Sequence, residues 1–167
     1  MTRAFLSFGS NLGDRLDYMR KATEALGRGP LLEVRSVAKV YETEPVEVEG
    51  AQPYYLNCVV EVRCGMPALE LLRFCQGVEA ALGRERKGER APRTLDVDVL
   101  LFDGEVQGEG PLILPHPGIG RAFNLKGLAD LDAGLYIPGR GTVGELLAGE
   151  DLAGVREYEG GRVVRPC

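Results

Sequence analysis

Residues 84–103, RERKGERAPRTLDVDVLLFD, join a cationic loop to an apolar strand and carry most of the information about the fold. Residues 84–93 hold five cationic and two anionic side chains, a local charge of +3 in a chain of net charge -5. Residues 95–102 are typical of a buried strand, with Asp96 and Asp98 at alternate positions. Two residues at such positions face the same side of a sheet, about 6.6 Å apart, because a strand rises roughly 3.3 Å per residue. Two buried carboxylates require a cationic partner.

Two kinds of cation would meet this requirement. In one interpretation the upstream arginines pair with Asp96 and Asp98 in a structural salt-bridge cluster. In the other, the aspartates hold Mg²⁺, which typically binds one or two protein carboxylates plus substrate phosphates, and the arginines bind those phosphates. The stretch alone favours neither interpretation.

Length and composition indicate one ordinary globular domain. We expect a single domain over residues 1–167, with the motifs in 1–131 and a C-terminal extension of the same domain in 132–167. No window reaches 18 consecutive apolar residues, and the apolar run before Gly9 is too short for a signal peptide, so we expect a cytoplasmic protein without a membrane partner. The four cysteines show no C-x-x-C spacing, and we expect Cys58 and Cys75 to be reduced thiols in the core. The acidic balance argues against general affinity for nucleic acid.

The order of predicted elements indicates an α+β sandwich, in which helices pack on one or both faces of a mainly antiparallel sheet. Hydrophobic periodicity and turn residues predict strands at 4–8, 32–41, 54–63 and 95–102, and helices at 15–26, 67–82 and 122–131, the last interrupted by Gly127. Asp103-Gly104 predicts a hairpin returning through residues 105–107, and Thr142 with Glu145 predicts the start of a short helix. A small hairpin is expected around Gly160-Gly161.

Three sets of polar residues are candidates for ligand binding. The even positions of 54–62 predict a core face that includes Tyr54, which places Tyr55 and Asn57 together on the opposite face. An aromatic ring beside an amide suits a planar heterocycle, although an exposed Tyr-Asn pair without function is the commoner explanation of such a pattern alone. Gln76 and Glu79 are expected on a helix face directed away from the apolar stripe. His116 lies alone in a Pro/Gly loop, where a structural role is the commoner one.

Four motifs together give the chain a resemblance to a known family. They are GSNLG at 9–13, TEP at 43–45 followed by YLN at 55–57, PRTLDVDVL at 92–100, and LPHP at 114–117 with RAF at 121–123. On these motifs the sequence resembles the 6-hydroxymethyl-7,8-dihydropterin pyrophosphokinase family, most specifically on the third. Many members carry Trp-Gly-Pro-Arg before that strand, where this chain has Arg90-Ala91-Pro92-Arg93.

The resemblance implies a ferredoxin-like fold, a monomer, and transfer of the terminal diphosphate of ATP to the pterin hydroxymethyl group in folate biosynthesis. It implies that Tyr55 and Phe123 sandwich the pterin, and that Asn57 and the segment around Gly9, Thr43, Pro45 and Val46 bind its polar edge. It implies two Mg²⁺ on Asp96 and Asp98, and catalytic roles for Arg84 and Arg93. The implied ATP-binding residues are Gln76, Glu79, Arg84, Arg86, Arg90, Arg93, Val99, His116 and Arg121.

Two other functions have to be weighed. A ferredoxin-like nucleic-acid-binding module would use Tyr55 and Phe123 as stacking platforms, but the chain lacks an RNP1-type aromatic string, and the aspartates would repel phosphates. An ordinary kinase transferring one phosphoryl group would be expected to carry a G-x-x-x-x-G-K-[ST] loop or a kinase signature, and neither is present.

Overall fold

The computed structural model describes residues 1–44, 54–83 and 94–163 and has an antiparallel sheet at its centre. The strand order is β4-β1-β3-β2-β7, and every neighbouring pair is antiparallel. The strands are β1 (Thr2–Ser10), β2 (Leu32–Thr43), β3 (Tyr55–Cys64), β4 (Asp96–Phe102) and β7 (Val155–Glu157). With a helix between β1 and β2 and another between β3 and β4, this is the βαββαβ arrangement of the ferredoxin-like fold. The predicted α+β class is confirmed.

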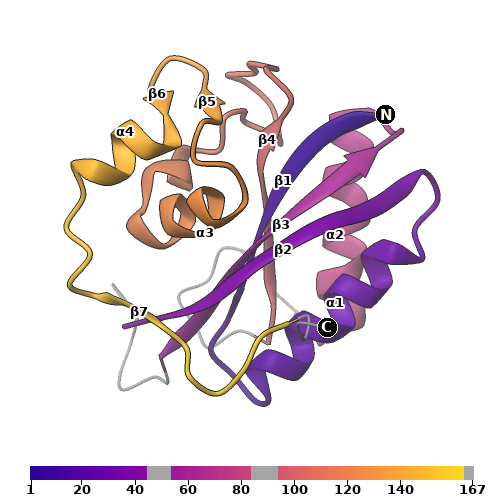
Figure 1. Ribbon diagram of the computed structural model, residues 1–167. Coiled ribbons are helices and arrows are strands. Elements are labelled where there is room, and N and C mark those ends of the chain that lie inside the picture. Colours follow the sequence, from indigo (N-terminus) through magenta and orange to yellow (C-terminus); the bar gives the residue numbers. More distant parts are fainter. Residues whose placement is uncertain (45–53, 84–93, 164–167) are drawn as a thin grey trace.

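Helices cover both faces of the sheet (Figure 1). One face carries α1 (Arg15–Gly27) and α2 (Ala68–Ala81), and the other carries α3 (Ala122–Asp132) with α4 (Val143–Ala148) beside it. A 3-10 turn, η1 (Pro117–Gly120), leads into α3, and a two-stranded sheet of β5 (Tyr136–Ile137) and β6 (Gly141–Thr142) separates α3 from α4. We call the two sides of the large sheet the α1/α2 face and the α3 face.

Side-chain alternation along the strands builds two hydrophobic cores. On β1, Leu6 and Phe8 pack with α1 and α2, whereas Phe5 packs with α3. On β3, Cys58 belongs to the first core and Val59 to the second. Because a strand places successive side chains on opposite faces, the central strands are apolar on both sides, and this double burial explains their nearly continuous hydrophobic sequence.

Strand β2 departs from the predicted alternation. The sequence pattern puts Ala38 and Val40 on one side, but Ala38 packs in the α3 core and Val40 in the α1/α2 core. Its pairing register with β3 shifts twice, between Val34 and Ser36 and again between Val37 and Val40. A β-bulge adds a residue to one strand and so exchanges the faces of every residue beyond it.

The hairpin predicted after β4 does not form. After β4, Glu105 N donates to Phe102 O in a turn, but Gln107 forms a bridge with Leu114 instead of returning along β4. The edge of β4 that a hairpin would occupy is reached by α2 instead, through the Glu79 carboxylate. At the C-terminal end, β7 pairs with β2, and the returning half of the hairpin predicted around Gly160-Gly161 lies partly outside the described residues, which end at 163. The capping box is confirmed, because Thr142 Oγ1 accepts from Glu145 N at 3.2 Å.

Helix α3 passes through Gly127 without a break, contrary to the prediction. A side chain at this position would overlap Val59 Cγ2 on β3, and its Cβ would stand 2.9 Å from Val59 Cβ. Gly127 therefore allows the helix to approach the sheet closely instead of interrupting the helix.

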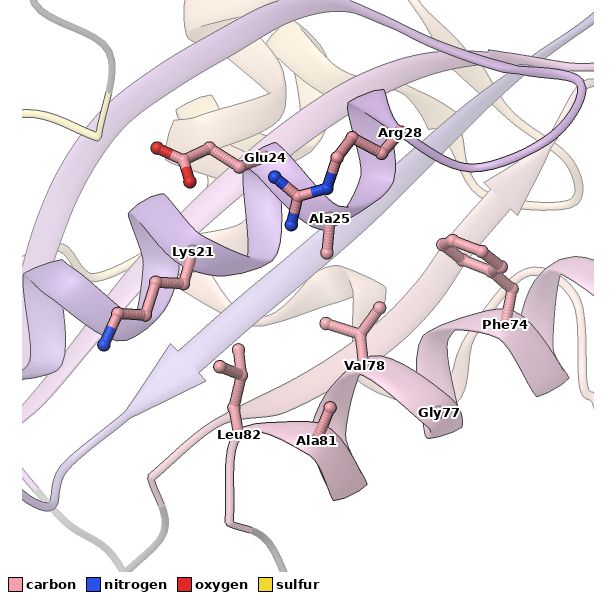
Figure 2. Close-up of a pocket in the computed structure, with 9 residues that line it drawn as sticks. All are labelled: Lys21, Glu24, Ala25, Arg28, Phe74, Gly77, Val78, Ala81 and Leu82. Atoms are coloured by element: carbon pink, nitrogen blue, oxygen red, sulfur yellow. The ribbon is translucent and has the colours of Figure 1, made fainter.

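A shallow apolar groove lies between α1 and α2 (Figure 2). It is lined by Lys21, Glu24, Ala25, Arg28, Phe74, Gly77, Val78, Ala81 and Leu82. Its charged side chains come from α1 and from Arg28, which directly follows that helix, and its aromatic ring comes from α2. The groove lies on the outer side of the helices, on the opposite face of the sheet from the polar residues described below. Among the described helices, none is both long and apolar enough to cross a membrane.

Candidate active site

Four polar or glycine positions stand in one row across the sheet. The strand register pairs Gly9 on β1 with Asp96 on β4 and with Asn57 on β3, and it pairs Asn57 with Tyr41 on β2. Neighbouring strands lie about 4.8 Å apart, so Asp96 and Asn57 are roughly 10 Å from each other. The predicted metal ligands and the predicted heterocycle-binding residues therefore meet at the same end of the sheet.

The aspartates of β4 share the α3 face. Leu95, Val97 and Val99 are buried in the α1/α2 core, so the alternate residues Asp96 and Asp98 point to the other side. Both aspartates are half-buried. The predicted strand and the shared face are confirmed.

Asn57 is buried and oriented by β2. Its Nδ2 donates to Thr43 Oγ1 at 2.9 Å and to Tyr41 O at 3.5 Å. The Oδ1 atom is directed towards Gly9, 3.8 Å from where a Cβ would stand at that position, and the Tyr55 ring lies at a similar distance. A side chain at position 9 would therefore occupy the surface formed by Asn57 and Tyr55.

Tyr41 fixes the end of β2 to α3. Its hydroxyl donates to Asp130 Oδ2 at 2.7 Å, and the Lys126 ammonium lies 5.6 Å from the ring centroid. Burial, reinforced by the bond to Asp130, raises the pKa of Tyr41 well above its usual range. The phenol consequently stays a neutral donor at all physiological pH values.

His116 connects the loop before η1 to the aspartate strand. Its Nδ1 accepts from Gly118 N at 2.9 Å, which leaves the ring proton of the neutral form on Nε2. Nε2 lies 3.6 Å from Asp98 Oδ1. The loop is also held by the bond from His116 N to Leu100 O on β4. The only histidine of the chain thus faces one of the two candidate metal ligands.

Arg121 and Phe123 form the start of α3. The Arg121 guanidinium lies over the Phe123 ring, 5.0 Å from its centroid, and the ring is half-buried. The next residue, Asn124, is buried, and its side-chain amide both accepts and donates a hydrogen bond. Ser7 Oγ donates to Asn124 Oδ1 at 2.8 Å, and Asn124 Nδ2 donates to Gly118 O at 2.9 Å. Asn124 therefore joins β1, η1 and α3.

The two candidates on α2 are arranged differently from the prediction. Gln76 is exposed, but Glu79 is only 3% exposed, and its Oε2 accepts from Val97 N at 2.9 Å. The expectation that both side chains face away from the apolar stripe is wrong for Glu79, because β4 is an edge strand whose outward N–H groups need an acceptor. The Val99 side chain is also buried, in the α1/α2 core, so only its backbone could contact a ligand.

The donor set fits magnesium. Within residues 1–44, 54–83 and 94–163, no three His, Cys, Asp or Glu side chains gather into a complete metal-binding group. Asp96 and Asp98 supply hard oxygen donors from one face of a strand, which suits an ion that keeps water molecules and substrate phosphates in its coordination shell.

The family model described as 7,8-dihydro-6-hydroxymethylpterin-pyrophosphokinase (HPPK) matches residues 5–133. The chain belongs to the HPPK family. The match contains the whole row from Asp96 to Tyr41, together with His116 and Phe123.

Curated relatives agree with the HPPK assignment, and a solved structure shares the fold. The chain is 40% identical over 129 residues to 2-amino-4-hydroxy-6-hydroxymethyldihydropteridine pyrophosphokinase of Bacillus subtilis, covering 77% of each chain. It is 38% identical over 160 residues to the protein of the same name from Methylorubrum extorquens, covering 95% of this chain and 100% of the relative. The wild-type Plasmodium falciparum HPPK-DHPS with STZ-DHP superposes with a TM-score of 0.68 at 12% identity over 88% of this chain. This chain spans 43% of that longer protein, and the similarity extends to the fold alone.

Several HPPK-family candidates lie outside the described residues. They are Pro45 and Val46 after β2, and Arg84, Arg86, Arg90 and Arg93 before β4. Conversely, sequence reasoning missed Ser7 and Asn124, which hold the α3 side of the site together. The available signal for Asn124 was an amide flanked by Phe123 and Leu125, because a buried amide requires bonding partners.

Proposed function

We propose that this chain transfers a pyrophosphoryl group from ATP to the hydroxymethyl group of 6-hydroxymethyl-7,8-dihydropterin in folate biosynthesis, and that it releases AMP. The observation that carries the proposal is the single row that joins Asp96, Gly9 and Asn57 within the span of the HPPK family match. A pyrophosphokinase has to hold two substrates side by side, and this row supplies neighbouring acidic and amide groups on one rigid sheet.

The pterin would bind at the end of β1, β2 and β3. In this proposal Tyr55 and Phe123 stack on the ring, and Asn57 bonds its polar edge. Thr43, Pro45 and Val46 complete that edge, and Gly9 leaves room for the ring next to Asn57. The bond between Asn57 and Thr43 supports this arrangement, because an amide whose nitrogen is already engaged presents a fixed carbonyl acceptor.

The nucleotide would bind over β4. Asp96 and Asp98 would hold two Mg²⁺, whose chemistry is to neutralise the phosphate oxygens and increase the acidity of the attacking hydroxyl. His116 would donate from Nε2 to a phosphate oxygen, since its Nδ1 accepts from Gly118 N. Arg121, whose guanidinium lies over the Phe123 ring, is also proposed to contact ATP. The remaining proposed ATP contacts are Gln76, Glu79, Arg84, Arg86, Arg90, Arg93 and the backbone of Val99.

In the proposed reaction the pterin hydroxymethyl oxygen forms a bond to the β-phosphorus of ATP. The bond from that phosphorus to the α–β bridging oxygen breaks, AMP leaves with the electron pair, and the hydroxyl proton is released. The protein residues position the two reactants and spread the negative charge, which is where most of the rate enhancement of phosphoryl-type transfer arises. Arg84 and Arg93 are proposed as the catalytic cations near the transferred group.

The remaining expectations are also proposals. We propose one domain over residues 1–167, in which the segment from 132 onwards belongs to the same unit, and this is supported by β7 joining the main sheet. We propose a monomer acting in the cytoplasm on small molecules, without nucleic-acid partners. The free thiols Cys58, Cys64 and Cys75 support a reducing compartment.

Identification of the nucleotide product tests the reaction. The protein is incubated with ATP, Mg²⁺ and 6-hydroxymethyl-7,8-dihydropterin, and the products are separated by ion-exchange chromatography. AMP and the pterin diphosphate should form in equal amounts, and neither should form when pterin is omitted. ADP as the product would indicate transfer of a single phosphoryl group, and tight RNA binding without turnover would favour the nucleic-acid-binding module.

A further inference from the structure

The segment beyond the family match returns to the proposed pterin end of the sheet. Residues 134–163 follow the span matched by the family model, and β7 within them pairs with residues 41–43 of β2. Tyr158 N donates to Val40 O at 2.8 Å, and Val163 is buried in the α1/α2 core. The C-terminal segment is therefore held at two places: residues 155–158 bond to β2, and Val163 packs in the core beneath the sheet.

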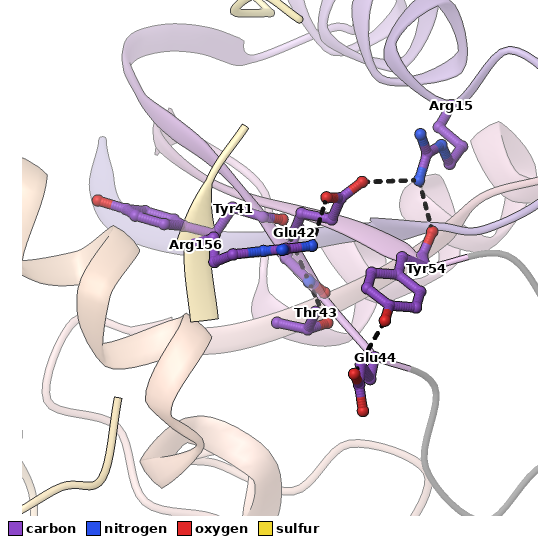
Figure 3. Close-up of polar contacts among 8 residues, drawn as sticks. Arg15, Tyr41, Glu42, Thr43, Glu44, Tyr54 and Arg156 are labelled. Atoms are coloured by element: carbon purple, nitrogen blue, oxygen red, sulfur yellow. Dashed lines mark hydrogen bonds and ion pairs between the residues drawn. The ribbon is translucent and has the colours of Figure 1, made fainter. Parts of the chain in front are cut away.

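The segment brings an arginine to Glu42, which accepts from two cations (Figure 3). Arg156 Nη2 of β7 lies 3.0 Å from Glu42 Oε1, and Arg15 Nη1 of α1 lies 3.5 Å from Oε2. The side chains of Glu42 and Arg15 are 22% and 21% exposed, so this pair is partly shielded from water. We call Arg15, Glu42 and Arg156 the arginine clamp.

The same arginines hold Tyr54, the residue just before β3. Arg15 Nη1 donates to Tyr54 O at 2.6 Å, and the Arg156 guanidinium lies 5.6 Å from the centroid of the Tyr54 ring. The Tyr54 hydroxyl in turn donates to Glu44 Oε1 at 2.9 Å. These contacts explain why Tyr54 is 38% exposed instead of lying in the core as its even position predicts. The clamp thus connects Glu42, near the end of β2, with Tyr54, which immediately precedes β3.

The proposed pterin residues lie directly on the other side of the clamped backbone. Glu42 neighbours Thr43, and Tyr54 neighbours Tyr55, while Thr43 and Tyr55 are register partners. Successive residues of a strand face opposite sides, so the clamp lies towards α1 while Thr43 is directed to Asn57. The clamp therefore supports this strand pair from behind the proposed binding surface.

We propose that Arg156 is a positioning residue for the pterin subsite. Through Glu42 and Tyr54, the arginine clamp holds Thr43, Tyr55 and Asn57 in the arrangement that binds the heterocycle before substrate arrives. Fixing a binding surface in advance removes part of the ordering cost of binding. This inference rests on the proposed function for its kinetic consequences, but its structural consequence is independent of the reaction.

Steady-state kinetics provide the first test. Arg156→Ala should raise KM for the pterin about three-fold to ten-fold, a small effect because exposed ion pairs are individually weak. KM for ATP and kcat should stay unchanged, and Arg156→Lys should restore part of the pterin affinity. Arg162→Ala is the matched control: Arg162 belongs to the same segment, is exposed, and its nearest ion-pair partner is Glu157 at 3.8 Å, outside the clamp. A pterin KM equal to wild type, or equal rises in both KM values, would overturn the proposal.

A second measurement works without turnover. Amide hydrogen exchange and chemical shifts of the substrate-free protein are compared between wild type, Arg156→Ala and Arg162→Ala. Faster exchange at Thr43 and Tyr55, and a shifted Asn57 side-chain amide, are expected in Arg156→Ala alone. If the wild type makes no AMP, the proposed function fails. The exchange comparison still tests whether Arg156 orders Thr43, Tyr55 and Asn57. Unchanged signals at all three residues in Arg156→Ala would refute it.

Discussion

At the scale of single residues, the site depends on side chains whose bonds orient them before any ligand binds. His116 accepts from Gly118 N and so presents Nε2 to Asp98, and Asn57 donates to Thr43 and so presents its Oδ1 towards Gly9. The residue types of these positions were evident from the sequence. Their orientations were not, because each depends on a bonding partner on another element.

Asp98→Asn tests the metal assignment. The substitution keeps the shape of the side chain and removes the charge that would ligate Mg²⁺. Turnover should fall by more than about 100-fold, since even changes to residues that only orient a metal ligand cost about 10- to 100-fold. Pterin binding, measured by fluorescence titration without nucleotide, should persist.

Asp103→Asn is the control for Asp98→Asn. Asp103 directly follows β4, is exposed, and has a φ of 50°, a conformation that Asn adopts readily. Turnover of this control should match wild type. Near-wild-type turnover of Asp98→Asn itself would remove Asp98 from the metal site.

Cys58 should be chemically inert while the protein is folded. Burial raises its pKa to about 12, so almost no thiolate exists at pH 8.5. Because the pKa in the folded protein exceeds the ordinary thiol value of 9.0, this thiol does not alter the free energy of unfolding below about pH 9, and it lowers that free energy as the pH rises towards 12. Iodoacetamide treatment followed by peptide mass spectrometry should leave Cys58 unmodified in buffer and modify it in urea. Equal alkylation under both conditions would show that the core around Cys58 opens readily.

At the scale of elements, the sequence patterns predicted the kinds and order of the main helices and strands. They did not predict the bulges within β2 or the close packing of α3 on β3. The run of apolar residues in β1, β3 and β4 is dictated by burial on both faces, and it was sufficient to locate those strands. The bulges of β2 change the face of the sheet that Ala38 occupies, and the alternation of apolar and polar residues does not predict where a bulge falls. Gly127 looked like a helix breaker because its packing partner, Val59, is far away in sequence.

Two glycine substitutions separate helix propensity from packing. Gly127→Ala gains up to about 1 kcal/mol of helix propensity, but forces a methyl group against Val59, and overpacking costs about 1–3 kcal/mol. The net effect should be destabilising and should lower Tm by several degrees, since about 1 kcal/mol corresponds to 2–4 °C at this chain length.

Gly77→Ala in α2 is the matched control, because a Cβ there meets nothing within 4 Å. It should raise stability by up to about 1 kcal/mol. Thermal unfolding followed by circular dichroism measures both variants. A Gly127→Ala protein as stable as Gly77→Ala would show that α3 packs less closely on β3 than described.

At the scale of the whole molecule, the sheet separates two surfaces with different properties. The α1/α2 face carries the larger core and the apolar groove, whereas the α3 face carries the row of polar residues. The sequence motifs predicted which residues share a face of the sheet, because Asp96 and Asp98, like Tyr55 and Asn57, are two positions apart on one strand. The C-terminal segment contributed no motif, and its contact with β2 could not be foreseen, since residues 42 and 156 meet only in the folded chain.

The position of the site on the α3 face is the central claim, and paramagnetic broadening tests it directly. Mn²⁺ and a non-hydrolysable ATP analogue are added to ¹⁵N-labelled protein, and amide line widths are compared with those of a Mg²⁺ sample. The amides of Gly9, Asp98 and His116 should broaden most strongly, with Asn57 next, since it lies roughly 10 Å from Asp96 across the strands. Strongest broadening at Ala25, Val78 and Leu82, which line the groove on the opposite face, would contradict the account.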